Sequence, residues 1–197
     1  KKIDVLDVLK NEKQQGNVVI GNIGRLAPQK GMEYFIEAAK LVLKKLPKAR
    51  FFIVGDGPLK DKLQQMIRQY HLEKFVHMLG YRSDIQNVMS QCDFIVLSSL
   101  WEGLPLTPIE AFSVSKTLVA TSVDGTPEIV KNNINGLLVE PNNVEQLADK
   151  ICYLIENKDY RKKLELSAKS TFDEQFSFAK LNENYVQYYI SLPITIP

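Results

Sequence analysis

Two glutamates, Glu102 and Glu110, lie eight positions apart around a turn, in a pattern that favours a binding site. An apolar, β-branched run at 94–97 precedes them, and Thr107 with Pro108 forms the hydroxyl cap and first-turn proline typical of a helix start. We therefore expect Glu102 in a loop at the carboxyl end of a strand and Glu110 one turn inside the next helix. Both would face the crevice where open α/β sheets bind ligands. Each glutamate also has an ordinary explanation, as a solvated loop charge or a helix-start charge favoured by the dipole.

A second loop, from Gly24 to Gly31, carries two cations, Arg25 and Lys30, five positions apart. It lies between an apolar run and a helical pattern, and the unpaired N–H groups and partial positive charge of a helix amino terminus favour anions. Arg25 could grip a phosphate with two hydrogen bonds, and Lys30 could add a mobile point charge. Two solvated surface residues are the alternative, but their place at a strand end predicts an anion site.

Two further loops follow predicted strands. Gly55 and Gly57 flank an aspartate before a proline, which suits a tight turn that lets the backbone approach a ligand closely. This is not a dinucleotide fingerprint, because Lys60 stands where the third glycine of G-x-G-x-x-G belongs. In the other loop, Tyr81 or Arg82 could cover a base, or both could be half-buried packing residues.

The residue types that bind metals do not form a recognisable metal site. The chain contains no D-x-D motif, and its two cysteines, Cys92 and Cys152, are far apart. His71 and His77 have a spacing that suits neither a metal nor a catalytic triad, and we interpret both as structural or surface residues. The sequence therefore predicts a site without a metal.

The composition is typical of a globular protein, with 45% hydrophobic and 24% charged residues among 197. A net charge of +2 without a basic stripe argues against a nucleic-acid-binding protein. The cysteine usage favours a reducing, cytoplasmic compartment, and no apolar run reaches the roughly 18 residues of a membrane span. No signal peptide opens the chain, and since it begins with Lys1 we expect a piece of a longer protein.

The elements that must position these loops alternate along the chain. We expect strands at about 18–23, 51–54, 75–79, 94–97, 117–120 and 136–139. We expect helices at about 32–46, 59–70, 85–92, 108–114, 127–130, 144–156, 160–171 and 178–192. About six strands that alternate with helices predict an α/β fold with a Rossmann-like, doubly wound parallel sheet and helices on both faces.

The predicted domain covers residues 17–192. Residues 1–16 are charged, Gln-rich and only weakly periodic, so we expect a linker there, and residues 193–197 form a short tail. The last two helices read as packing additions, and the final one carries an apolar stripe with Phe178 and Tyr185, of a kind that is more often core than a cofactor site.

Together, the four loops resemble the carboxyl-terminal, nucleotide-sugar-binding domain of the family-4 (group 1) retaining glycosyltransferases of the GT-B fold. The resemblance runs from about residue 18 to 192 and is most specific in the E-x7-E element formed by Glu102 and Glu110. It implies that the chain is one half of a GT-B fold. One departure is Asp124-Gly125, where the family often has paired glycines, so a backbone contact to phosphate is not carried over to this position.

The resemblance also implies roles for these residues. Arg25 and Lys30 would bind the donor diphosphate and stabilise its leaving charge without a metal. Glu102 would hold hydroxyls of the donor sugar, and Glu110 the ribose diol. In the front-face reaction proposed for the family, an oxygen of the leaving phosphate takes the acceptor proton. The full set of expected donor contacts adds Gly24, Gly55, Gly57, Tyr81, Arg82, Gly103, Leu104 and Pro105.

No cofactor is expected besides the donor substrate, for which a UDP-sugar is favoured over a GDP-sugar. The acceptor site would lie on an amino-terminal domain of the same polypeptide, so this piece should bind donor without transferring it. The last helix would pack across the interdomain region and be partly exposed here. Polysaccharide or glycolipid synthesis at the inner face of a membrane fits the habits of the family.

Two other functions remain open on the sequence alone. A GT-B nucleotide-sugar epimerase would share the architecture but depend on other acid–base residues. A non-catalytic nucleotide-binding module would share the loops without needing the charges at Arg25 and Glu102. A nicotinamide-dependent oxidoreductase is disfavoured by the incomplete glycine fingerprint.

Overall fold

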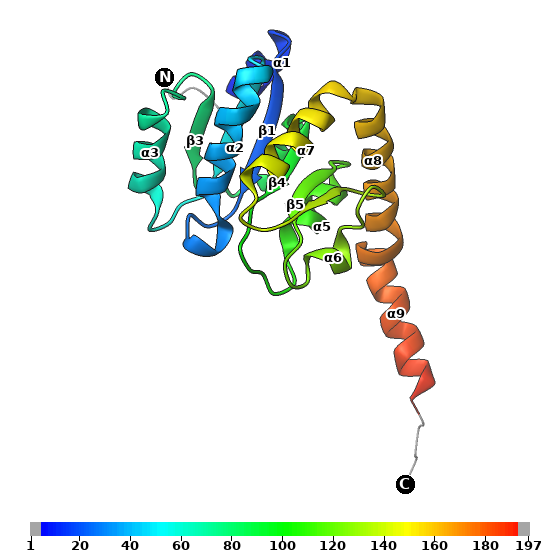
Figure 1. Ribbon diagram of the computed structural model, residues 1–197. Coiled ribbons are helices and arrows are strands. Elements are labelled where there is room, and N and C mark those ends of the chain that lie inside the picture. Colours follow the sequence, from blue (N-terminus) through cyan, green and yellow to red (C-terminus); the bar gives the residue numbers. More distant parts are fainter. Residues whose placement is uncertain (1–4, 193–197) are drawn as a thin grey trace.

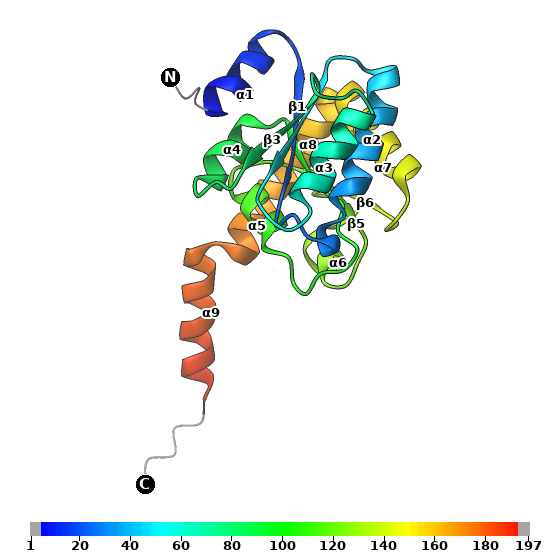
Figure 2. The same cartoon turned by 90° about the vertical axis from the view of Figure 1, so that its left-hand side faces the viewer.

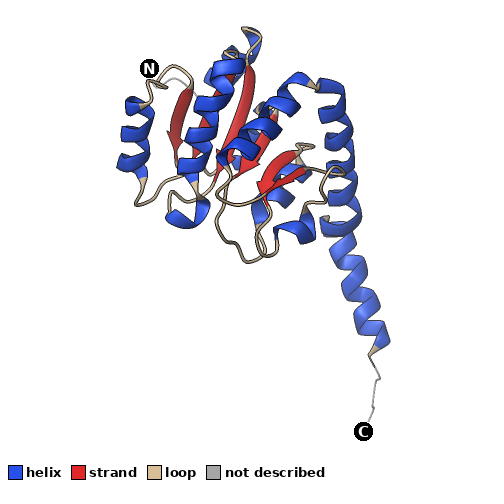
Figure 3. Cartoon of the chain, in the orientation of Figure 1, coloured by secondary structure: helices blue, strands red, loops and turns tan. Residues whose placement is uncertain are grey.

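The sheet is parallel throughout, and its strand order brings two loops together. The computed structural model describes residues 5–192, within which six strands form one sheet in the order β3-β2-β1-β4-β5-β6 (Figure 1, Figure 3). The strands are β1 (Val18–Ile23), β2 (Ala49–Val54), β3 (Val76–Gly80), β4 (Phe94–Leu97), β5 (Leu118–Thr121) and β6 (Leu137–Val139). The chain moves outward from β1 to β3 and then returns to the far side of β1, so the loops after β1 and β4 are neighbours. The predicted Rossmann-like α/β fold is confirmed.

Both faces of the sheet are buried, which explains why the strands are continuous apolar runs. Neighbouring residues of a strand point to opposite faces, so Phe51 and Phe52 belong to different layers of the core. The ring of Phe51 meets that of Phe35 edge to face, with 5.5 Å between the centroids. Because a shift by one residue would exchange the two layers, this packing fixes the strand register.

Helices cover both faces of the sheet (Figure 2). One face carries α2 (Met32–Lys45), α3 (Lys60–Gln69) and α7 (Val144–Glu156); the other carries α1 (Val5–Gln14), α4 (Ile85–Gln91) and α5 (Leu106–Ser113). The helix α8 (Lys158–Thr171) packs against α5 and α7. Shorter elements are η1 (Pro28–Lys30), α6 (Thr126–Ile129) and η2 (Phe172–Phe176), a single turn of π-helix.

The prediction of a linker over residues 1–16 is wrong for most of this segment, because Val5–Gln14 form the helix α1. Leu9 is fully buried against the layer that contains Phe52, and α1 packs on α4 and β1. A short helix needs only one or two apolar residues on its inner face, so its periodicity is weak in the sequence. Residues 1–4 and the predicted tail at 193–197 lie outside the described residues.

The last helix, α9 (Phe178–Ser191), extends away from the sheet (Figure 1, Figure 2). None of its side chains is buried, and Phe178 and Ile190 are 76% and 77% exposed. The apolar stripe is therefore not part of this core, in agreement with the expected exposure of this helix. Across residues 5–192, no helix combines the length and apolar character needed to cross a membrane.

Candidate functional site

The loops after β1 and β4 are joined directly where the strand order reverses. The side-chain amide of Asn22, in β1, donates to Ser98 Oγ at 3.0 Å, and this hydroxyl donates to the Lys30 carbonyl at 3.1 Å. The Leu100 N–H donates to the Gln29 carbonyl at 2.8 Å. Reversal points of open parallel sheets are their usual ligand-binding crevices, and here the crevice is braced from both sides.

Glu102 is the centre of this junction. Its Oε1 accepts hydrogen bonds from Lys30 Nζ at 2.5 Å and from Ser99 Oγ at 2.6 Å, and its Oε2 lies 3.4 Å from Gln29 Nε2. The Glu102 side chain is only 5% exposed and that of Lys30 18% exposed. A buried carboxylate is stable only when paired and hydrogen-bonded, and these partners meet that requirement. Sequence reasoning paired Glu102 with Glu110 and missed Lys30 as its direct partner.

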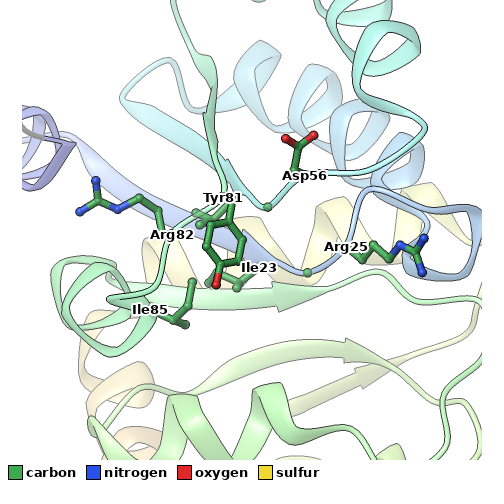
Figure 4. Close-up of a pocket in the computed structure, with 9 residues that line it drawn as sticks. Ile23, Arg25, Asp56, Tyr81, Arg82 and Ile85 are labelled. Carbon is green, nitrogen blue, oxygen red and sulfur yellow. The ribbon is translucent and has the colours of Figure 1, made fainter. Parts of the chain in front are cut away.

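Arg25 lies in the same loop but differs from Lys30 in its surroundings. It is exposed, and among the described residues its side chain has no hydrogen-bond or ion-pair partner. In Figure 4 its guanidinium points away from Tyr81 and Arg82, toward the opposite end of the pocket. In the loop after β1, Lys30 is therefore ion-paired with Glu102, while the side chain of Arg25 has no partner among the described residues.

A pocket of about 430 Å³ opens beside this loop (Figure 4). Its lining comes from the ends of β1, β2 and β3 and from the start of α4: Ile23, Gly24, Arg25, Val54, Gly55, Asp56, Tyr81, Arg82 and Ile85. Tyr81 is 76% exposed, and its ring lies beside Ile23 and above Ile85 in Figure 4. A flat ring next to aliphatic side chains suits a planar apolar group such as a nucleobase.

The backbone at Gly55 approaches the loop after β1 too closely for any side chain. Its φ is +145°, and a Cβ there would collide with the carbonyl of Gly24. The Gly24 N–H in turn donates to the Val54 carbonyl at 3.0 Å. The glycine therefore allows the loops after β1 and β2 to touch backbone to backbone, and the close approach of a ligand to it stays a prediction.

Arg82 lines the pocket and forms an ion pair with Asp84. Its guanidinium donates to both carboxylate oxygens of Asp84, at 2.7 Å and 2.6 Å. These hydrogen bonds lower the pKa of Asp84 below its ordinary value. The fork geometry holds the Gly80–Asp84 turn in shape. Whether Arg82 also contacts a base stays a prediction.

Glu110 lies in different surroundings from Glu102. It lines a separate cavity of about 350 Å³ together with residues at the start of α4: Ser83, Asp84, Ile85, Gln86 and Asn87. Ile85 lines both cavities, so they adjoin. Glu102 lines neither of these cavities, so a crevice shared by the two glutamates stays a prediction. The helix also begins at Leu106 rather than Pro108, because prolines are tolerated in a first turn, where N–H groups have no helical partner.

The turn between Glu102 and α5 leaves backbone donors available. Gly103 and Leu104 are exposed, and in the described part of the chain their N–H groups have no acceptor. Pro105 is buried as the N-cap residue of α5 and gives no side-chain cap to the helix. Unpaired N–H groups at a helix start bind anions and hydroxyl oxygens.

Asp124, noted in the sequence only as a departure from the family pattern, contacts this turn from the loop after β5. Its Oδ2 accepts a hydrogen bond from the Glu102 N–H at 2.7 Å. Its place after a predicted strand and the departure from paired glycines were the signals in the sequence, but neither indicated a contact with Glu102. The two histidines lie outside the site, as expected: His77 stacks on Phe52, with 5.2 Å between the ring centroids. No cluster of potential metal ligands occurs among residues 5–192.

Comparisons with known proteins agree with this geometry. The family model of the Glycosyl transferases group 1 matches residues 7–171. The chain is 32% identical over 178 residues to the poly(ribitol-phosphate) alpha-N-acetylglucosaminyltransferase of Staphylococcus aureus, a match that covers 90% of this chain and 36% of that protein.

Solved structures give the same result. Anabaena HepE in complex with UDP matches with a TM-score of 0.83 and 29% identity, covering 96% of this chain and 54% of that one. HepE has also been solved with UDP-glucose. The C-terminal domain of a glycosyl transferase group 1 family protein from Francisella tularensis matches with a TM-score of 0.78 and 28% identity, covering 86% of this chain and 93% of that one.

The chain spans about a third of the length of the Staphylococcus aureus relative and about half that of HepE. Its parallel sheet, its braced reversal point and the match over residues 7–171 all point to one family. The chain belongs to the group 1 glycosyl transferases and is a carboxyl-terminal, nucleotide-sugar-binding domain of the GT-B fold.

Proposed function

We propose that this chain binds a UDP-hexose and that the whole protein transfers the hexose, with retention of configuration, to an acceptor hydroxyl. The observation that carries the proposal is the buried ion pair of Lys30 and Glu102 at the reversal point of the sheet, beside the pocket of Gly55 and Tyr81. It supports a role for Lys30 as a cation for phosphate next to a surface suited to a base.

The base and ribose would occupy the two adjoining cavities. Tyr81, Ile23 and Ile85 form apolar walls for uracil, and the neighbouring cavity holds Glu110, whose carboxylate can accept hydrogen bonds from both ribose hydroxyls. The complexes of HepE with UDP and UDP-glucose support UDP as the nucleotide.

The diphosphate would lie between Arg25 and Lys30. The Lys30 ammonium has three N–H donors, so it can keep its bond to Glu102 while it donates to a phosphate oxygen. Arg25 is free to form a bidentate contact. As the bond between the sugar C1 and the β-phosphate oxygen breaks, these fixed cations stabilise the negative charge that grows on UDP.

The sugar would lie over the turn after β4. Three contacts already occupy the Glu102 carboxylate, which has about four acceptor positions, so one position remains for a sugar hydroxyl. The free N–H groups of Gly103 and Leu104 complete this surface. Glu102 then holds the donor, while the acceptor oxygen bonds to C1 and its proton passes to an oxygen of the leaving phosphate.

The acceptor would come from another domain of the polypeptide. The exposed stripe of α9, with Phe178, Tyr185 and Tyr189, offers an apolar surface for that domain to cover. The identity of the hexose and the acceptor, the cytoplasmic location and the association with a membrane surface stay predictions.

Calorimetric titration of this chain with UDP, UDP-glucose, UDP-galactose, UDP-N-acetylglucosamine and GDP-mannose tests the proposal. We expect binding of UDP and at least one UDP-hexose, weaker binding of GDP-mannose, and no change when EDTA is present. Lys30→Met should weaken binding, and the control Lys45→Met should not, because Lys45 pairs with Asp149 on the exposed surface of α2 and α7. A folded chain that binds none of these nucleotides would contradict the proposal.

A further inference from the structure

Asp124 is an exposed aspartate whose backbone adopts an unusual conformation. It lies between β5 and α6 with a φ of +41°, and it is the only aspartate with positive φ among the described residues. Positive φ is strained for residues other than glycine and is tolerated best by Asn and Asp. Such strain persists only where surrounding contacts hold it in place.

Those contacts are with the turn that carries Glu102. The Asp124 carboxylate accepts the Glu102 N–H at 2.7 Å, and the next residue, Gly125, donates its N–H to the Gly103 carbonyl at 3.1 Å. A Cβ on Gly125 would lie 2.5 Å from that carbonyl oxygen, so the two loops touch backbone to backbone. Two consecutive residues of one loop are thus bonded to two consecutive residues of the other.

This pairing determines which way the free donors point. The peptide between Gly103 and Leu104 is planar and trans, so its N–H points opposite to its carbonyl. Since the Gly103 carbonyl faces Gly125, the Leu104 N–H faces away from the loop after β5. The Glu102 N–H is used by Asp124, while the N–H groups of Gly103 and Leu104 stay free in the described structure.

We propose that Asp124 is a positioning residue for the donor sugar: it fixes the Glu102–Gly103 turn so that the free N–H groups and the Glu102 carboxylate form one hydroxyl-binding surface. The inference rests on the proposed function, because it needs a donor sugar at this turn. It predicts that Asp124 acts on the sugar part of the donor and not on UDP, whose expected contacts lie in the loops after β1, β2 and β3 and on Glu110.

The ratio of two dissociation constants, for the UDP-hexose that the wild-type chain binds best and for UDP alone, tests this role. In Asp124→Ala we expect the ratio to rise about fivefold or more, while the affinity for UDP stays within about twofold of wild type. Asp124→Asn keeps an acceptor oxygen and tolerates positive φ, so its ratio should stay within about twofold of wild type.

Asn133→Ala is the matched control. Asn133 also has positive φ, at +63°, and its side chain accepts one hydrogen bond, from Tyr160, but it lies in the loop that precedes β6. Its ratio should equal that of wild type even if the melting temperature falls. Should Asp124→Ala not fold, Asp124→Gly removes the acceptor without strain and carries the same expectation.

An unchanged ratio in a folded Asp124→Ala or Asp124→Gly variant would overturn the inference and leave Asp124 with a purely structural role. Failure of the wild-type chain to bind UDP and every UDP-hexose is a different result, since it would overturn the proposed function together with this inference.

Discussion

Lys30 and Glu102 lie 72 positions apart in the sequence and form an ion pair with an Nζ to Oε1 distance of 2.5 Å. The pair joins the loop after β1 to the loop after β4, the two loops that the reversal of strand order makes neighbours. The cation that we propose for the phosphate is thereby held by the residue that we propose for the sugar.

Removal of the Lys30 side chain should lower both the free energy of unfolding and the affinity for UDP-sugars. Lys30→Met leaves the Glu102 carboxylate buried without its cation, and we expect a loss of about 3 kcal/mol in the free energy of unfolding. For a domain of this size this corresponds to a melting temperature roughly 6–12 °C lower. The double variant Lys30→Met with Glu102→Gln should recover part of the stability and none of the UDP-sugar affinity. Equal losses in the single and double variants would show that the pair is not coupled.

Removal of the Arg25 side chain should lower the affinity for UDP and UDP-sugars without lowering the stability of the fold. The side chain is exposed and unengaged in the described structure, so Arg25→Ala should leave the melting temperature within about 1 °C of wild type. Loss of a charged hydrogen bond to phosphate should weaken UDP and UDP-sugars by about tenfold or more in calorimetry. Arg68→Ala, an exposed arginine on α3, is the control. If both variants bind UDP like wild type, Arg25 does not contact the diphosphate.

The ring of Tyr81 should contribute through stacking on the base. Tyr81→Ala should weaken UDP binding by about tenfold, since base stacking on an aromatic ring is worth about 1–3 kcal/mol. Tyr81→Phe keeps the ring and should bind as wild type does. Inorganic pyrophosphate lacks a base, so its affinity should be the same for all three proteins. A loss of pyrophosphate affinity in Tyr81→Ala would mean that the loop, rather than stacking, is affected.

His77 should make the fold less stable in acid. Burial lowers the pKa of His77 below its ordinary 6.5, and its buried Nε2 has no hydrogen-bond partner in the described structure. The unfolded chain therefore binds a proton before the folded chain does as the pH falls through about 6.5, and stability decreases from there down to the folded pKa. His77→Phe keeps a ring stacked on Phe52 and should be more stable at pH 5, measured by urea unfolding at pH 5 and pH 8.

His71→Asn is the control for this titration, since asparagine tolerates the positive φ of +56° at that position. It should keep the pH dependence of the wild-type chain. If His77→Phe also keeps it, another group is responsible for the loss of stability in acid.

The fold could be predicted because each buried strand and most helices leave a local pattern of apolar residues in the sequence. Runs such as 51–54 and 94–97 are apolar on both faces, and α7 begins and ends where its periodicity does, at Val144 and Glu156. The helix α1 could not be predicted, because Leu9 is the one fully buried side chain among residues 6–14 and a single residue gives no period.

The sequence predicted where the candidate site residues lie in the fold, but not which of them contact one another. Sequence spacing placed Arg25, Lys30 and Glu102 at strand ends, and the structure keeps them there. The contact of Lys30 with Glu102 depends on which strands are neighbours, and the role of Asp124 depends on a φ of +41° and on the approach of two loops. Neither follows from the distance between residues along the chain.

The most direct measurement is a map of backbone amide chemical shifts of the isotopically labelled chain during titration with UDP. We expect shifts at Gly24, Arg25, Gly55, Tyr81 and Glu110, which line the two cavities at the carboxyl ends of β1 to β3 and the start of α5. Shifts confined to the other large cavity, beside β3 and lined by Gln64, Arg68 and His77, would contradict this expectation.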